Sequence, residues 1–188
     1  MIPSDHFVRF YNEVFKALQQ KGCRHLVAYW RELGRLQTLA LGKRFRGGGI
    51  KECAAYWRSI IREENCAATL IEHADHIELR MRRCPSLSKV LDNDASPFPL
   101  YCDHCMGWIE PVMVYANLHA VIDIRSRSRP ECRLYVCRTA ERAEEFRRRA
   151  VLPAMPYSNH AAHVTPRFNT GKNRKRETPG SHNRRQRQ

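Results

Sequence analysis

The sequence predicts an α+β protein in which N-terminal helices precede two antiparallel β-hairpins that flank a Cys-x-x-Cys helix, followed by a disordered C-terminal tail. Three patterns predict this fold. Apolar residues recur at helical spacing up to Ile61, and they alternate with polar residues in the segments that follow. The third pattern is charge, because residues 166–188 contain eight basic residues and one acidic residue.

The N-terminal region is predicted to be helical. Ser4 is a suitable N-cap for the first helix, and Gly22 is expected to end it. Three glycines at 47–49 separate the second helix from the third, so we expect a hinge or loop there. The apolar stripes of the three helices cover residues 7–18, 26–39 and 50–61.

Two hairpins follow the helices. Alternating apolar residues at 77–81 predict a half-buried strand, and residues 67–73 are its expected partner across a short turn. Residues 122–124 and 132–136 show the same alternation and predict the second hairpin.

Two helices are expected between the hairpins and one after them. A short one covers residues 88–92, and an amphipathic one begins at Cys102. Pro111 falls within the second and has no N–H to donate, so it should start a new helix or kink this one. Thr139 is expected to cap a last helix that fades before Pro153.

We divide the chain into three parts. An N-terminal helical region covers 1–48, an α+β pocket domain with the cysteine cluster covers 49–152, and a disordered basic tail covers 153–188. A length of 188 residues suits one domain with a tail.

Charge and composition limit the function classes. The formal net charge is +14, but half of this excess lies in the tail, so the folded part is only moderately basic. The tail is expected to bind nucleic acid weakly and without sequence preference, or to be simply solvated. No apolar run approaches the roughly 20 residues that cross a bilayer, and no signal peptide is recognised, which predicts a cytoplasmic protein without a membrane partner.

Eight cysteines in a reducing compartment serve as core residues, metal ligands or nucleophiles more often than as disulfides. Cys102 and Cys105 are the most informative, because thiols at i and i+3 point to the same side of a helix start, where its positive end favours thiolates. They are candidates for a metal pair, a redox dithiol or two buried side chains. The redox use normally requires a thioredoxin-like βαβ context, which this chain lacks.

Zinc needs four ligands, or three with an open position. Cys132 and Cys137 lie five residues apart on one strand and therefore face opposite sides, and Cys132 shares the inward face. Cys84 ends its strand before Pro85 and can turn inward. Four core thiols are the alternative to a zinc site, and Cys23, Cys53 and Cys66 are expected to be packing residues. The best predicted metal cluster is Cys84, Cys102, Cys105 and Cys132.

Three strings carry a family resemblance across residues 50–138: Arg82-Arg83-Cys84-Pro85, Tyr101-Cys102-Asp103-His104-Cys105 and Cys132-Arg133-Leu134-Tyr135. Together they resemble the family of L-2-amino-thiazoline-4-carboxylic acid hydrolase and, more distantly, the 4-vinyl-reductase-type small-molecule-binding domains. Members commonly carry Gly-Asp before the last cysteine, where this chain has Pro130-Glu131. The resemblance implies an α+β domain with an enclosed pocket for a small organic molecule, in some relatives beside a cysteine-bound zinc.

The resemblance also implies hydrolysis of a cyclic C–N bond in a small heterocycle. Such a reaction needs an activated water or thiolate and a group that protonates the departing nitrogen. Cys102 or Cys105 could be the nucleophile or hold the metal, and His104 could exchange the proton, although a histidine in a short turn is more often simply solvated. Tyr101 is the other polar group expected in the pocket.

A non-enzymatic function is the alternative. In that case the basic tail would bind nucleic acid or a partner, and the cysteines would be structural.

Overall fold

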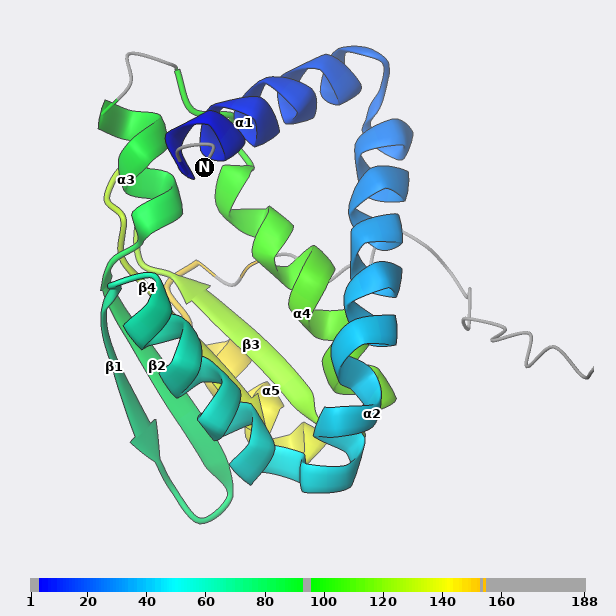
Figure 1. Ribbon diagram of the computed structural model, residues 1–188, viewed down its shortest axis with the longest axis vertical. Coiled ribbons are helices and arrows are strands. Elements are labelled where there is room, and N and C mark those ends of the chain that lie inside the picture. Colours follow the sequence, from blue (N-terminus) through cyan, green and yellow to red (C-terminus); the bar gives the residue numbers. More distant parts are fainter. Residues whose placement is uncertain (1–3, 93–95, 153, 155–188) are drawn as a thin grey trace, which may run out of the picture.

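The computed structural model describes residues 4–92, 96–152 and 154, and Figure 1 shows how its helices and strands are arranged. Helices α1 (Ser4–Gln20) and α2 (Cys23–Glu63) begin the chain. Gly22 joins them with a φ of 116°, a conformation that favours glycine. Apart from Ala154, which is buried and hydrogen-bonded to Ile122, the tail on which the alternative function depends lies outside the described residues.

The predicted hinge is a single residue within α2. Gly49 has φ 57° and ψ −145°, a combination open essentially to glycine, whereas Gly47 and Gly48 stay helical. The prediction of two helical segments separated at the glycines is therefore confirmed, with the break at Gly49 alone. The kink turns the second half of α2 onto the sheet, where Ile50 and Cys53 are buried in the core.

Helix α4 (His104–Tyr115) follows a 3₁₀ turn, η1 (Tyr101–Asp103), and packs along α2. Pro111 was expected to start a new helix or to kink this one, but a single helical segment spans it. Proline leaves the carbonyl four residues before it without a helical donor. That carbonyl belongs to Gly107 and faces Gly34 of α2, where an added Cβ would lie only 2.4 Å from the oxygen.

The two predicted hairpins are present and join into one antiparallel sheet of order β1-β2-β4-β3. β2 pairs with β4, which places Leu79 directly opposite Leu134 in the middle of the sheet. The α+β prediction is confirmed. The strands are β1 (Ala67–Glu72), β2 (His76–Arg83), β3 (His119–Ile124) and β4 (Cys132–Cys137).

Helices cover both faces of the sheet. α4 and the second half of α2 cover the face with the main core, and α5 (Ala140–Arg149) packs on the other face against β3 and β4. Thr139 caps α5 as predicted, because its side chain accepts a hydrogen bond from the backbone N–H of Arg142. The predicted parity of β4 also holds, since Cys132 packs against the main core and Cys137 lies under α5.

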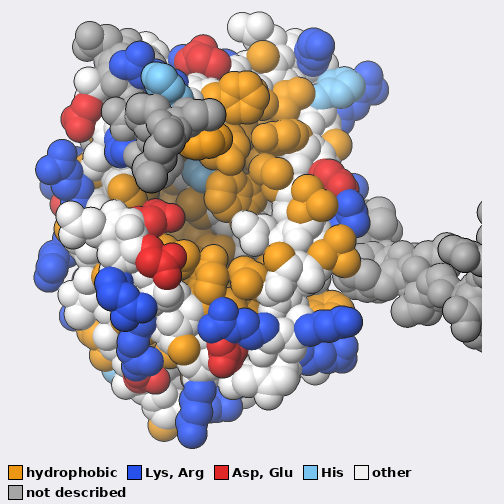
Figure 2. Space-filling view, viewed as in Figure 1, with side chains coloured by type: hydrophobic (Ala, Val, Ile, Leu, Met, Phe, Trp, Pro, Cys, Tyr) orange, Lys and Arg blue, Asp and Glu red, His pale blue; other side chains and the backbone are white. Residues whose placement is uncertain are grey.

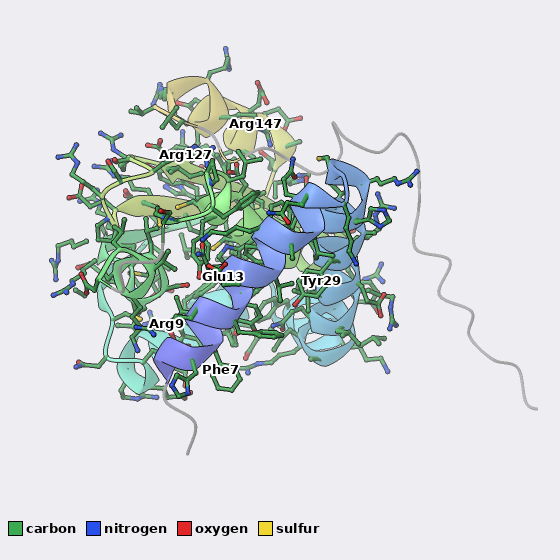
Figure 3. The ribbon with its side chains drawn as sticks, turned by 90° about the horizontal axis from the view of Figure 1, so that it is seen from above. Phe7, Arg9, Glu13, Tyr29, Arg127 and Arg147 are labelled. Carbon is green, nitrogen blue, oxygen red and sulfur yellow. The ribbon has the colours of Figure 1, made fainter. Side chains whose placement is uncertain are left out.

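A second apolar cluster joins α1 to α3 (Pro85–Asp92), with Phe15 and Trp30 at its centre. Asn12 is fully buried there, and its Oδ1 accepts a hydrogen bond from the N–H of Phe98 at 2.8 Å. Figure 2 shows hydrophobic side chains gathered in the hollow middle of the helical face, and Figure 3 shows α5, with Arg147, across the molecule from the start of α1, with Phe7. Among the described helices, none combines the length and apolar character that crossing a membrane requires.

Candidate functional site

Four cysteines from different elements line one cavity of about 50 Å³ at the end of the sheet. They are the four residues predicted as a metal cluster. Tyr101 and His104 line the same cavity. The members of the cluster are Cys84, Cys102, Cys105 and Cys132.

Local structure explains why the thiols converge. Cys84 lies between β2 and α3, and its sulfur accepts a hydrogen bond from the N–H of Leu87 at 3.5 Å, so a thiol occupies the place of a serine or aspartate N-cap. Pro85 then occupies the first helical position, which suits proline. Cys102 lies in the 3₁₀ turn and Cys105 in the first turn of α4. The starts of two helices thus meet beside the first residue of β4.

His104 is buried, not solvated as a histidine in a short turn usually is. Its Nδ1–H donates to the carbonyl oxygen of Tyr101, which leaves the lone pair on Nε2. Nε2 lies 3.7 Å from the sulfur of Cys105. Burial lowers the pKa of His104 to about 4, although the Tyr101 carbonyl opposes this shift. His104 is therefore a neutral acceptor at pH 7.

Burial also raises the pKa values of the four cluster thiols. It raises the pKa of Cys84 to about 11 and the pKa of Cys102 and Cys105 to about 12, and it raises the pKa of Cys132 as well. Neighbouring thiols add to the shift at Cys84, Cys102 and Cys132. The expectation of thiolates at the helix start was wrong, because desolvation outweighs the field of the helix end.

The β3–β4 loop forms one wall of the cavity. Pro130 lines it, and the carbonyl oxygen of Pro130 accepts a hydrogen bond from the N–H of Cys84 at 2.6 Å. Arg127 of the same loop donates from Nη1 to the buried carboxylate of Asp103 at 2.5 Å and to the carbonyl of Pro99 at 3.2 Å. We name residues 125–131 the closing loop.

Sequence reasoning missed Arg127 and the role of Asp103. A charged residue inside a Cys-x-x-Cys string suggests that a partner exists, but no spacing pattern points to an arginine 24 residues later. Reasoning also missed that the Tyr101 hydroxyl forms a hydrogen bond with Ser86 at 2.7 Å, which joins the start of α3 to the 3₁₀ turn.

The remaining cysteines lie apart from this cavity's lining. Cys53 is buried in the core and Cys66 is half-buried, as expected of packing residues. Cys23 is exposed, so its assignment to packing was wrong.

The four cluster thiols line the walls of the cavity and do not already surround one point. Within residues 4–92, 96–152 and 154, no group of three or more histidine, cysteine, aspartate or glutamate side chains is arranged to hold a metal ion as it stands. Cysteine sulfur is a ligand that a thiophilic ion prefers. The present positions of the four thiols, however, are not those of ligands around one ion.

Comparison of the chain with family models, curated proteins and solved structures gives no match. The family resemblance therefore stays a prediction.

Proposed function

We propose that the four-cysteine cavity binds one thiophilic metal ion, with zinc as the first candidate. The observation that carries the proposal is that four thiols from separate elements line one cavity of about 50 Å³. A water molecule takes about 30 Å³, so this volume suits an ion or one or two waters. Zinc prefers cysteine sulfur and histidine nitrogen, which are the donors present.

Binding requires two local changes. The proposal requires the thiols to turn inward by changes of rotamer, which move a cysteine sulfur without moving the backbone. Each ligand must also lose its proton, because thiolates bind metals and thiols do not. The cytoplasm, where thiols stay reduced, is the compartment that we propose for the protein.

Hydrolysis of a cyclic C–N bond in a small heterocycle is the second candidate function, favoured by the neutral His104 beside Cys105. In this reaction the Cys105 sulfur would bond to the ring carbon as the C–N bond breaks, and Nε2 would pass the thiol proton to the departing nitrogen. A water molecule would then cleave the new S–C bond, which places its hydroxyl on the carbon and restores the thiol. Organic ligands usually occupy pockets of roughly 300–1,000 Å³. The closing loop would therefore have to open to admit one.

The two functions assign Cys105 differently, because a metal ligand is not free to act as a nucleophile. A bound zinc ion would supply Lewis-acid chemistry. In that case Cys105 would serve as a ligand, and His104 would remain the proton acceptor.

Elemental analysis of the full chain, purified under reducing conditions in metal-free buffers, tests the proposal. We expect about one zinc per chain in the parent protein, and a loss of more than half of it in the Cys102→Ser/Cys105→Ser variant. Cys23→Ser/Cys66→Ser is the matched control and should keep its zinc. Less than about a tenth of a zinc per chain, with an unchanged melting temperature in chelator, would leave four core thiols as the explanation.

A thermal-shift screen with small sulfur- or nitrogen-containing heterocycles tests the second function. A ligand that binds only the folded state must raise the melting temperature. If no compound changes either the melting temperature or the alkylation rate of the cluster thiols, the small-molecule function is wrong.

A further inference from the structure

Arginines gather on the face of the sheet that carries α5, which looks away from the viewer in Figure 1. α5 packs on this face over β3 and β4. Alternation along the strands places Arg80 and Arg82 of β2 and Arg133 of β4 on the same face, and Arg125 directly follows β3. We name these four residues the arginine face.

Two of the arginines stand directly opposite each other, because the β2–β4 register pairs Arg80 with Arg133. Like charges at opposite positions repel. A single buried carboxylate serves both: Glu78 accepts from Arg80 at 2.8 and 2.9 Å, and its nearer oxygen lies 3.7 Å from Arg133. Asp123 of β3 stands on the other side of Arg133, so the four arginines meet two buried carboxylates, Glu78 and Asp123, and positive charge remains in excess.

Arg125 also pairs with a buried carboxylate, at the end of β3. Its Nη1 donates to Asp123 at 2.9 Å, while the other carboxylate oxygen of Asp123 accepts from the N–H groups of Val151 and Leu152. The arginine side chains remain accessible, since Arg80 is 50% exposed, Arg133 41% and Arg125 39%. The buried carboxylates orient the guanidinium groups without covering them.

We propose that the arginine face binds the phosphate backbone of a nucleic acid. The planar guanidinium group suits the oxygens of a phosphate, and several in a row suit a repeating polyanion better than one small anion. Tyr135, an aromatic residue of the same face, is buried and stacked on Phe146 at 4.0 Å, so it is not available to bases. Binding is therefore independent of sequence and sensitive to salt.

The path of the chain after α5 supports a nucleic-acid partner. Leu152 and Ala154 pair with the free edge of β3, through Ile124 N–H to Leu152 O at 2.8 Å and Ala154 N–H to Ile122 O at 2.9 Å. The described chain thus ends beside Asp123. The sequence that follows contains the eight basic residues of 166–188, so the same chain carries a second basic segment.

The test uses the full chain and a fluorescein-labelled 20-nucleotide oligothymidine, with the dissociation constant measured by anisotropy between 50 and 200 mM salt. We compare Arg82→Gln/Arg133→Gln with Arg24→Gln/Arg31→Gln, which removes the same charge from exposed sites near the start of α2. The first variant should bind about tenfold more weakly at 50 mM salt, and its salt slope should fall by about 1.4, which corresponds to two lost phosphate contacts. The control should change less than about twofold.

A second pair of variants removes no existing side-chain contact of the sheet arginines. Thr69 is exposed and directly opposite Arg80, so Thr69→Glu places a negative charge beside the arginine face, and Ala28→Glu adds the same charge on α2. Thr69→Glu should weaken binding several-fold more than Ala28→Glu. If each test variant and its control lose the same affinity for oligothymidine, the tail and not the arginine face binds the nucleic acid, and the proposal is wrong. So would an unmeasurable affinity of the parent chain, or binding to phosphatidylserine vesicles but not to oligothymidine.

Discussion

The Nε2 atom of His104 faces the sulfur of Cys105 at 3.7 Å, while Nδ1 of the same ring is held by the carbonyl of Tyr101. The backbone carbonyl therefore selects the tautomer that presents a lone pair to the thiol. Histidines that bind metals are commonly anchored in the same way through their second nitrogen. Both candidate functions of the cavity use this anchored nitrogen.

The first prediction concerns stability in mild acid. Burial lowers the pKa of His104 to about 4, from 6.5. Between these values the unfolded chain binds a proton that the folded chain does not, so the free energy of unfolding falls as the pH drops from 6.5 towards 4. The free energy of unfolding falls by about 3 kcal/mol if the folded protein has the full shift in the pKa of His104. Urea unfolding at pH 7 and pH 4.5 measures it.

His104→Asn supplies the comparison, because an amide can replace the Nδ1 donor but does not titrate. This variant should lose less stability than the parent between pH 7 and 4.5. His25→Asn, at an exposed histidine of α2, should match the parent. Identical pH profiles for the parent and His104→Asn would mean that the folded protein protonates His104 readily.

The second prediction concerns protons released on metal binding. The raised pKa values keep the cluster thiols protonated at pH 7, with that of Cys84 at about 11 and that of Cys102 at about 12. Zinc must then displace about one proton for each cysteine ligand, and its apparent affinity must rise with pH. Calorimetric titration of the reduced chain in buffers of different ionisation enthalpy counts these protons. Release of fewer than about one proton per zinc would contradict binding at the cluster.

The sequence predicted the features that depend on neighbouring residues. The opposite faces of Cys132 and Cys137 follow from the two-residue period of a strand, and Cys102 and Cys105 share a side because of their helical spacing. These rules are local, so Cys102, Cys105 and Cys132 could be grouped before the fold was known, whereas Cys84, next to Pro85, was added only because it could turn inward.

Features that depend on distant contacts were not predicted. The three glycines at 47–49 predicted a hinge, but the sequence does not show that Gly49 alone leaves the helical conformation while Gly47 and Gly48 stay helical. Pro111 stays within α4 beside Gly34, 77 positions earlier in the sequence. The burial of His104 depends on α1, because the Phe15 ring lies 5.3 Å from the imidazole. No local pattern carries this information.

The third prediction tests the close approach of α2 and α4. A Cβ at Gly34 would lie 2.4 Å from the Gly107 oxygen and 2.7 Å from Pro111 Cγ, so Gly34→Ala forces the two helices apart. We expect a loss of about 2 kcal/mol in the free energy of unfolding, since overpacking outweighs the better helix propensity of alanine. Gly47→Ala is the matched control, because it meets nothing within 4 Å and should be stabilising by up to about 1 kcal/mol. Equal midpoints in urea for the two variants would show that α4 can move away without cost.

The last prediction tests the closing loop over the cysteine cavity. Arg127→Ala removes one partner of the buried Asp103 carboxylate and one link between the loop and the start of α4. If the variant lowers the free energy of opening the loop by about 1.4 kcal/mol, the population with an open loop rises tenfold. The cluster thiols should then react about tenfold faster with a disulfide reagent. A Cys23→Ser background removes the exposed thiol from the signal. Arg129→Ala, at an exposed arginine of the same loop, should leave the rate near that of the parent. If Arg127→Ala reacts no faster than Arg129→Ala, the thiols reach solvent by a route that does not involve the loop, and an organic ligand would enter by that route as well.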